Sequence, residues 1–93
     1  MVDRRFIYRV HAVQRMFERS VSAGDVRRVL AEGEVIEKYP TDTPFPSRLM
    51  LAFVNSRPLH VVAADNPLGD ETYVITVYEP DPDQWDATFR LRD

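Results

Sequence analysis

The amino-acid sequence predicts an α+β domain in which two N-terminal helices pack on one face of a three- to four-stranded antiparallel sheet. Two observations lead to this expectation. Apolar residues recur with a helical period over the first third of the chain, and after Gly33 they form strand-like runs separated by short turns. A chain of 93 residues has room for one core, so we expect a single domain over residues 1–93.

The first expected helix covers about residues 9–19. Its apolar positions Val10, Val13 and Phe17, with Met16 beside them, follow a helical period. We expect the stripe of Val13, Met16 and Phe17 to face the core. The helix has a weak start, because the residues before it are poor helix caps.

The second expected helix covers about residues 22–32 and has a sharper start. Ser22 and Asp25 have the spacing of a capping box, in which each side chain satisfies the other residue's backbone N–H. Gly33 is placed to end the helix. The expected buried stripe consists of Val26, Val29 and Leu30.

Strand character follows in the segments 34–39, 48–54, 59–64 and 72–79. Residues 48–54 are apolar at nearly every position, which indicates a central or covered strand. A loop with three prolines, residues 40–46, separates the first two strands. Near the end of the chain, Trp85 and Phe89 are expected to fold back as a lid on the core.

Composition excludes several classes of protein. Without cysteine there is no disulfide scaffold and no cysteine zinc site, and two histidines 49 positions apart give no metal signal. Three glycines and no GxxxxGK[ST] motif rule out a glycine-rich phosphate loop, so we expect neither a metal nor a cofactor. No apolar run approaches the roughly 20 residues of a membrane-spanning helix, and no signal peptide is evident. We therefore expect a cytoplasmic protein without a membrane partner.

The charge is divided along the chain. Residues 1–28 carry seven arginines against three acidic residues, a balance of +4, while the remainder carries −7, giving −3 overall. The basic part could therefore still face a polyanion. Within it, His11, Arg15 and Arg19 are spaced i, i+4, i+8, so they share a band on the first helix. Such a band can hold phosphates; the alternative is a solvated polar face.

Two strand residues are further candidates. His60 lies within an apolar strand, where a histidine is either a hydrogen-bonded core residue or, on an open face, a general base. Tyr78 lies at the end of the last strand. Its phenol either packs with the hydroxyl in water or orients a ribose or scissile phosphate.

The chain resembles a family of small bacterial and archaeal proteins known as domain of unknown function 4258. The resemblance rests on four blocks and a tryptophan: His11 to Arg19 with Val21-Ser22, Gly33 to Tyr39, Arg57 to Val62, Ile75 to Asp81, and Trp85. It covers about residues 10–90. The family is distantly similar to the RelE/ParE-type toxin fold. This implies a RelE-like, endoribonuclease-like toxin of a toxin–antitoxin pair, with an antitoxin protein as partner and with RNA or the ribosome as target.

Two functional hypotheses follow. In the first, the domain cleaves RNA without metal: His60 or His11 moves the proton, Arg15 and Arg19 hold the phosphate, and Tyr78 orients the substrate. In the second, the domain is a non-catalytic module that binds a protein partner with the same surface.

Overall fold

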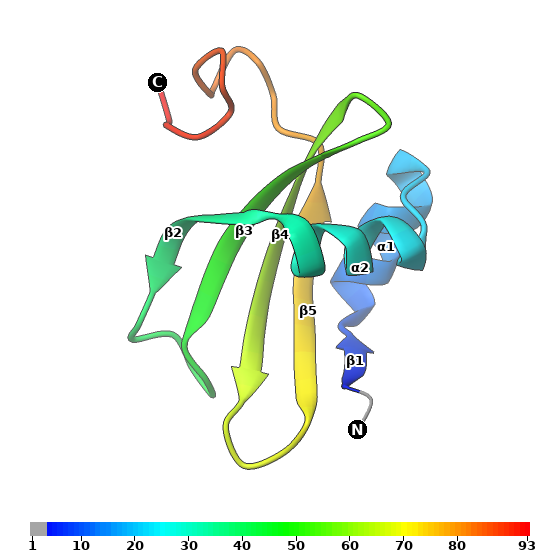
Figure 1. Ribbon diagram of the computed structural model, residues 1–93, viewed down its shortest axis with the longest axis vertical. Coiled ribbons are helices and arrows are strands. Elements are labelled where there is room, and N and C mark those ends of the chain that lie inside the picture. The colour runs from blue at the N-terminus through cyan, green and yellow to red at the C-terminus, as the bar shows by residue number, and fades with distance from the viewer. Residues whose placement is uncertain (1–3) are drawn as a thin grey trace.

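The computed structural model describes residues 4–93 of the chain. Seven elements follow one another: β1 (Arg5–Tyr8), α1 (Val10–Arg19), α2 (Ala23–Glu32), β2 (Glu34–Tyr39), β3 (Ser47–Val54), β4 (Arg57–Asn66) and β5 (Glu71–Tyr78) (Figure 1). The α+β class, the two helices and the four strands after them are therefore as the sequence predicts.

The sheet has five strands in the order β1-β5-β4-β3-β2. Strands β2 to β5 pair antiparallel with their neighbours, but β1 pairs parallel with β5. The expectation of three or four antiparallel strands behind two leading helices is thus wrong in two respects: the sheet is mixed, and its first strand precedes the helices.

Strand β1 has no clear signature of its own. It is four residues long, with Phe6, Ile7 and Tyr8 in a row, which is too short a run to show alternation. Pairing with β5 holds it in place, because Phe6 lies opposite Thr72 and Tyr8 opposite Val74. An ion pair between Arg5 and Glu71 fixes the same end. The strand is therefore specified by a segment more than 60 residues away.

Helix α2 follows the prediction closely. The Ser22 hydroxyl accepts a hydrogen bond from the Asp25 N–H at 3.0 Å, and the Asp25 carboxylate accepts one from the Ser22 N–H at 3.0 Å. Val26 and Val29 are fully buried, and the helix packs across β3 and β4. Gly33 ends it at a place where any side chain would collide with the backbone of Val29 and Leu51.

Helix α1 differs from the prediction in the face that it buries. Ala12 is fully buried and Met16 packs beside it, whereas Val13 and Phe17 are 51% and 88% exposed. The helix continues directly from the edge strand β1, with the Arg9 N–H bonded to the Val74 carbonyl, and lies along β5 (Figure 1). At this edge only a narrow side of the helix meets the sheet, and the small Ala12 allows the close approach.

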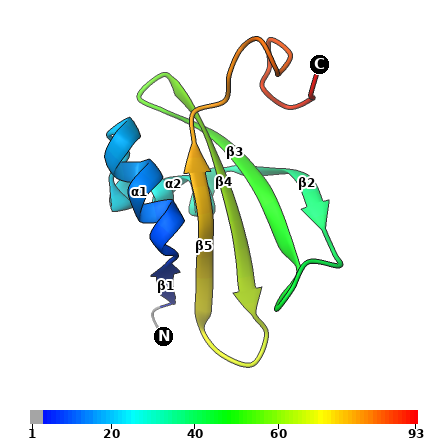
Figure 2. The same cartoon turned by 180° about the vertical axis from the view of Figure 1, so that it is seen from behind.

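The sheet has two covered faces. Met50, Val61 and Val77 lie in register on the face of the sheet that α2 covers at β3 and β4, and they belong to the main core. Leu51, His60 and Tyr78 lie in register on the opposite face. Residues 80–93, the C-terminal tail, fold over one end of the sheet (Figure 2).

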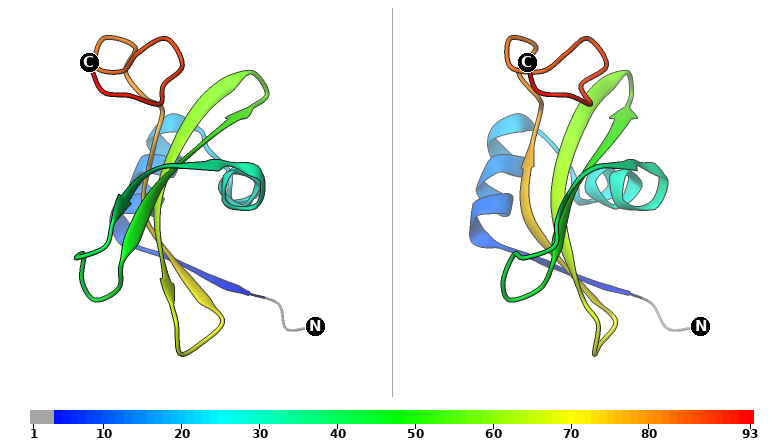
Figure 3. Two further views of the ribbon diagram at one scale, coloured as in Figure 1. Left: turned by 60° about the vertical axis from the view of Figure 1, so that its left-hand side comes forward. Right: turned by 90° about the vertical axis from the view of Figure 1, so that its left-hand side faces the viewer.

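Trp85 anchors the tail on the sheet. It is 3% exposed, and its ring packs edge-on against the His60 ring, with 4.5 Å between the ring centres. Phe89 is half-buried and contacts Phe53. The expected lid of Trp85 and Phe89 is thus confirmed. Figure 3 shows α1 beside β5, α2 across the sheet, and the C-terminal tail over one end of the strands. Within residues 4–93, no helix is long and apolar enough to cross a membrane.

Candidate functional site

A hollow of about 420 Å³ lies where α1, β5 and the C-terminal tail meet. Helix α1 contributes Arg15 and Arg19, β5 contributes Thr76 and Tyr78, and the tail contributes Arg92 together with Trp85. Three guanidinium groups and a phenol, from three separate segments, therefore line one depression. We call it the arginine hollow.

His60 has no exposed surface, and its ring contacts Tyr78 and Trp85, two residues that line this hollow. Its Nδ1 is 3.2 Å from the Tyr78 hydroxyl, and its Nε2 is 2.9 Å from the Phe89 carbonyl oxygen. Because a carbonyl only accepts, Nε2 carries the proton, and in the neutral ring Nδ1 accepts from Tyr78. Burial lowers the pKa of His60, against the opposing effect of the Phe89 carbonyl, which favours this neutral form.

Tyr78 is the polar group that leads from the buried His60 to the surface. Burial raises its pKa, so the phenol is protonated at neutral pH and its oxygen retains capacity to accept a second hydrogen bond. Tyr78 and Arg92 also line a second hollow of about 580 Å³. That hollow extends towards Tyr39 and Ser47. Tyr78 and Arg92 therefore contribute to the lining of both hollows.

Arg92 is held in place from two sides. Its guanidinium lies 4.5 Å from the centre of the Trp85 ring and pairs with the Glu37 carboxylate at 3.2 Å. The Arg92 hydrogen bond, aided by Tyr39, lowers the pKa of Glu37 despite partial burial. Arg92 is therefore a cation pre-positioned by β2 and the tail.

Arg57 positions the end of α1 that carries Arg19. Its guanidinium donates to the carbonyl oxygens of Arg19, the last residue of α1, and of Ser20, which caps the helix, and it pairs with Glu79 at 2.8 Å. A cation at this place also complements the negative end of the helix dipole. Ser20 adopts a left-handed conformation that ends the helix.

The charge of the arginine hollow is basic but not strongly so. Against its three arginines stand Glu79 and Asp81. Glu79 is paired with Arg57 and Arg92 with Glu37, so Arg15, Arg19 and Asp81 remain and give the hollow a small positive surplus. The hollow suits an anion of limited size, such as one or two backbone phosphates.

The structure brings together four of the five candidate residues. Arg15, Arg19 and Tyr78 line the hollow, and His60 supports Tyr78 from below. His11 is exposed on α1, one turn before Arg15, and is not among the residues that line it. No group of three or more histidine, aspartate or glutamate residues that could hold a metal ion occurs in the described part of the chain.

Sequence reasoning missed Arg92 and Arg57. Arg57 stood in one of the blocks that carry the family resemblance, directly before Pro58-Leu59-His60. Arg92 had only a weak signal, as a cation that follows the acidic segment of the tail. Its role depends on Glu37 and Trp85, which local sequence does not place beside it.

No curated protein and no solved structure matches the chain. The predicted similarity to RelE/ParE-type toxins is therefore not shown. The family described as domain of unknown function (DUF4258) matches residues 8–79, which include every candidate residue named from the sequence and end just before the tail. That range is more than half of the chain, and the protein belongs to this family.

Proposed function

We propose that the protein is the toxin-like component of a toxin–antitoxin pair and that it cleaves RNA without a metal ion at the arginine hollow. The observation that supports this most directly is the shared lining of the hollow by Arg15, Arg19, Arg92 and Tyr78 above His60. Guanidinium groups bind phosphate through paired, charge-assisted hydrogen bonds.

In the proposed reaction the Tyr78 oxygen accepts the proton of a ribose 2′-hydroxyl while the Tyr78 proton passes to Nδ1 of His60. The 3.2 Å hydrogen bond supports this transfer, and the resulting imidazolium still donates from Nε2 to Phe89. The 2′-oxygen then attacks the adjacent phosphorus. The 5′-oxygen leaves and takes a proton from water, and His60 later returns its proton to solvent. The products are a 2′,3′-cyclic phosphate and a 5′-hydroxyl.

The arginines stabilise the charge that develops on the phosphate during the attack. Arg15 and Arg19 come from α1 and Arg92 from the tail, so they approach the phosphate from two segments. Donors fixed before the reaction stabilise a transition state more than mobile ones do. The contacts of Arg92 with Trp85 and Glu37 supply such fixation.

The second candidate function is a non-catalytic module that binds a protein. It is favoured by the exposed apolar stripe of α1, where Val10, Val13 and Phe17 are 75%, 51% and 88% exposed. Exposed apolar residues that gather on one helix face are typical of protein contacts. In the toxin proposal the same stripe would receive the antitoxin, close to the arginines of the same helix.

Binding of single-stranded RNA across a range of salt concentrations tests the proposed site. We expect Arg15→Gln with Arg19→Gln to weaken binding and to reduce the salt slope by about 1.4, since each phosphate contact contributes about 0.7. Arg28→Gln is the matched control, because Arg28 pairs with Glu32 on the exposed side of α2. Equal RNA affinity of all three proteins would contradict the proposal.

A cellular experiment tests the toxin–antitoxin part separately. Induced expression of the chain alone should arrest growth, and co-expression of the adjacent reading frame should relieve it. Arg15→Gln with Arg19→Gln should abolish the arrest. Normal growth on expression of folded wild-type protein would favour the binding module.

A further inference from the structure

A second basic hollow lies on the face of the sheet that α2 covers, away from the arginine hollow. It has a volume of about 400 Å³ and is lined by Arg4, Arg27 and Arg48 around Asp65 and Thr72, with Phe6 at one wall. The lining residues lie in β1, α2, β3, β4 and β5, except Arg4, which directly precedes β1. Neither the family description nor the proposed function assigns a role to this hollow.

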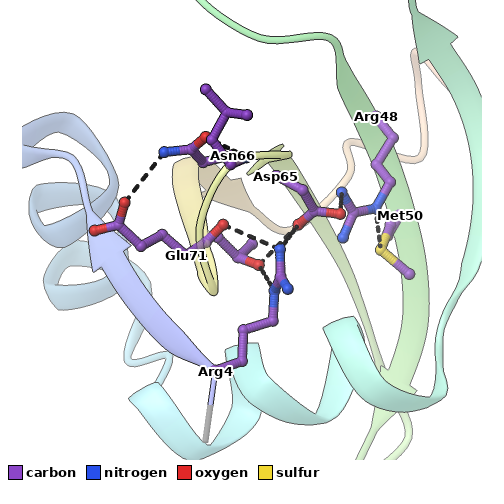
Figure 4. A network of polar contacts seen from close by, with 8 residues as sticks. Arg4, Arg48, Met50, Asp65, Asn66 and Glu71 are labelled. Atoms are coloured by element: carbon purple, nitrogen blue, oxygen red, sulfur yellow. Dashed lines mark hydrogen bonds and ion pairs between the residues drawn. The ribbon is translucent and has the colours of Figure 1, made fainter. Parts of the chain in front are cut away.

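Asp65 is the centre of the network. Its Oδ1 is 3.1 Å from Arg4 and accepts a hydrogen bond from Thr72 at 2.8 Å, and its Oδ2 is 3.2 Å from Arg48 (Figure 4). Partial burial acts to raise the pKa of Asp65, but Thr72, Arg48 and Arg4 together lower it. The carboxylate is therefore ionised at neutral pH and orients two guanidinium groups.

The hollow keeps a positive surplus. Three arginines against one carboxylate leave a balance of +2 in a chain whose overall charge is −3. Arg48 uses Nε towards the Met50 sulfur and Nη1 towards Asp65 (Figure 4). Among residues 4–93, no hydrogen bond occupies its Nη2. A fixed guanidinium with free donors is suited to an anion.

An apolar hollow of about 400 Å³ adjoins the basic one and shares Arg48 and Asp65 with it. Its apolar lining consists of Val35, Pro40, Pro46 and Pro67, and Lys38 and Ser47 also line it. The two hollows share the Arg48–Asp65 ion pair in their walls, with cations on one side of it and mainly apolar side chains on the other. We call this pair of hollows the Arg48 cleft.

We propose that the Arg48 cleft binds a small organic phosphate, with the phosphate on Arg4, Arg27 and Arg48 and the ring of the ligand against the prolines. Both volumes suit a ligand of this size, and such sites combine apolar walls with a few placed polar groups. Asp65 orients Arg4 and Arg48, and Arg27 lines the same hollow. This compact group of cations favours a single phosphate group over an extended chain.

Calorimetric titration with adenosine 5′-monophosphate tests the proposal on the whole chain. We expect saturable binding by the wild type, with adenosine and inorganic phosphate each at least tenfold weaker because each fills only half of the cleft. Arg27→Gln and Arg48→Gln should each weaken binding about tenfold. Arg27→Gln changes an exposed helix residue, so it protects the test against misfolding of the Arg48 variant.

Two control proteins test whether the nucleotide binds at the Arg48 cleft. Arg28→Gln, one residue from Arg27 but paired with Glu32, should bind as the wild type does. Arg15→Gln with Arg19→Gln should also bind normally, because those residues line the other hollow. Three results would overturn the proposal: no saturable binding at millimolar nucleotide, inorganic phosphate binding as tightly as the nucleotide, or loss of binding only in the Arg15 and Arg19 variant. None of these results bears on RNA cleavage.

Discussion

The Tyr78 hydroxyl lies 3.2 Å from Nδ1 of His60, on neighbouring strands where the two residues are in register. The other ring nitrogen of His60 holds the Phe89 carbonyl at 2.9 Å. One buried imidazole therefore links the sheet, the arginine hollow and the C-terminal tail. Stability and the proposed chemistry both depend on this ring. The substitution decides which of the two is tested: His60→Ala tests stability, and His60→Gln tests cleavage.

Replacement of His60 by alanine should lower the free energy of unfolding by about 2–4 kcal/mol, because it removes a fully buried ring and leaves the Phe89 carbonyl without its donor. Equilibrium unfolding in urea measures the change. The matched control is His11→Ala on exposed α1, expected within about 0.5 kcal/mol of wild type. Equal effects of the two substitutions would show that His60 is not a structural link.

The free energy of unfolding should depend on pH through His60. Its pKa is lowered in the folded state, so between that value and the ordinary value of 6.5 the unfolded chain binds more protons. This contribution to stability is complete above about pH 6.5, declines as the pH falls below 6.5, and declines no further below the folded pKa. His60→Gln should remove this slope. Its persistence in the variant would assign it to another group.

Arg57→Gln should destabilise the protein by about 1–2 kcal/mol, because it removes the donors to the last carbonyls of α1 and the ion pair with Glu79. Thermal unfolding monitored by circular dichroism measures the loss. Arg28→Gln removes an exposed helix pair and should cost at most about 0.5 kcal/mol. RNA affinity should also fall in Arg57→Gln, since Arg19 loses its support. A stable variant with normal RNA binding would contradict this positioning role.

Trp85→Ala should lower the free energy of unfolding by about 3–5 kcal/mol. The indole is buried against His60, and the Arg92 guanidinium packs on its ring. Since it is the single tryptophan, its fluorescence in the wild type reports directly on the tail. Arg92→Gln should shift the emission towards that of exposed indole only slightly, as burial against His60 persists. A large shift would show that the Arg92 contacts hold the tail down.

Local signals were sufficient for much of the fold. The capping box of Ser22 and Asp25 involves residues three positions apart, and both hydrogen bonds form as expected. The strands after Gly33 were likewise evident from short-range patterns. Strand β1 was not, because its partner β5 lies at the other end of the chain.

The same distinction applies to the candidate site. Arg15 and Arg19 share a helix face by spacing alone, and the structure places both in the hollow. The exposure of Phe17 could not be read from its period, because α1 meets the sheet along a narrow edge. Arg92 reaches the hollow only through the fold of the tail against Glu37.

The most direct test of the proposed activity is the cleavage of RNA by Tyr78→Phe in the presence of EDTA. This substitution removes one hydroxyl and keeps the ring, so the fold and the three arginines remain. Free RNA and translating ribosomes serve as substrates, with wild type, His60→Gln and His11→Gln assayed beside it. We expect the wild type to produce 2′,3′-cyclic phosphate ends, Tyr78→Phe and His60→Gln to be slower by about 10²–10⁴-fold with RNA affinity retained, and His11→Gln to be unchanged. Undiminished cleavage by Tyr78→Phe, or none by the folded wild type on either substrate, would contradict the proposed mechanism.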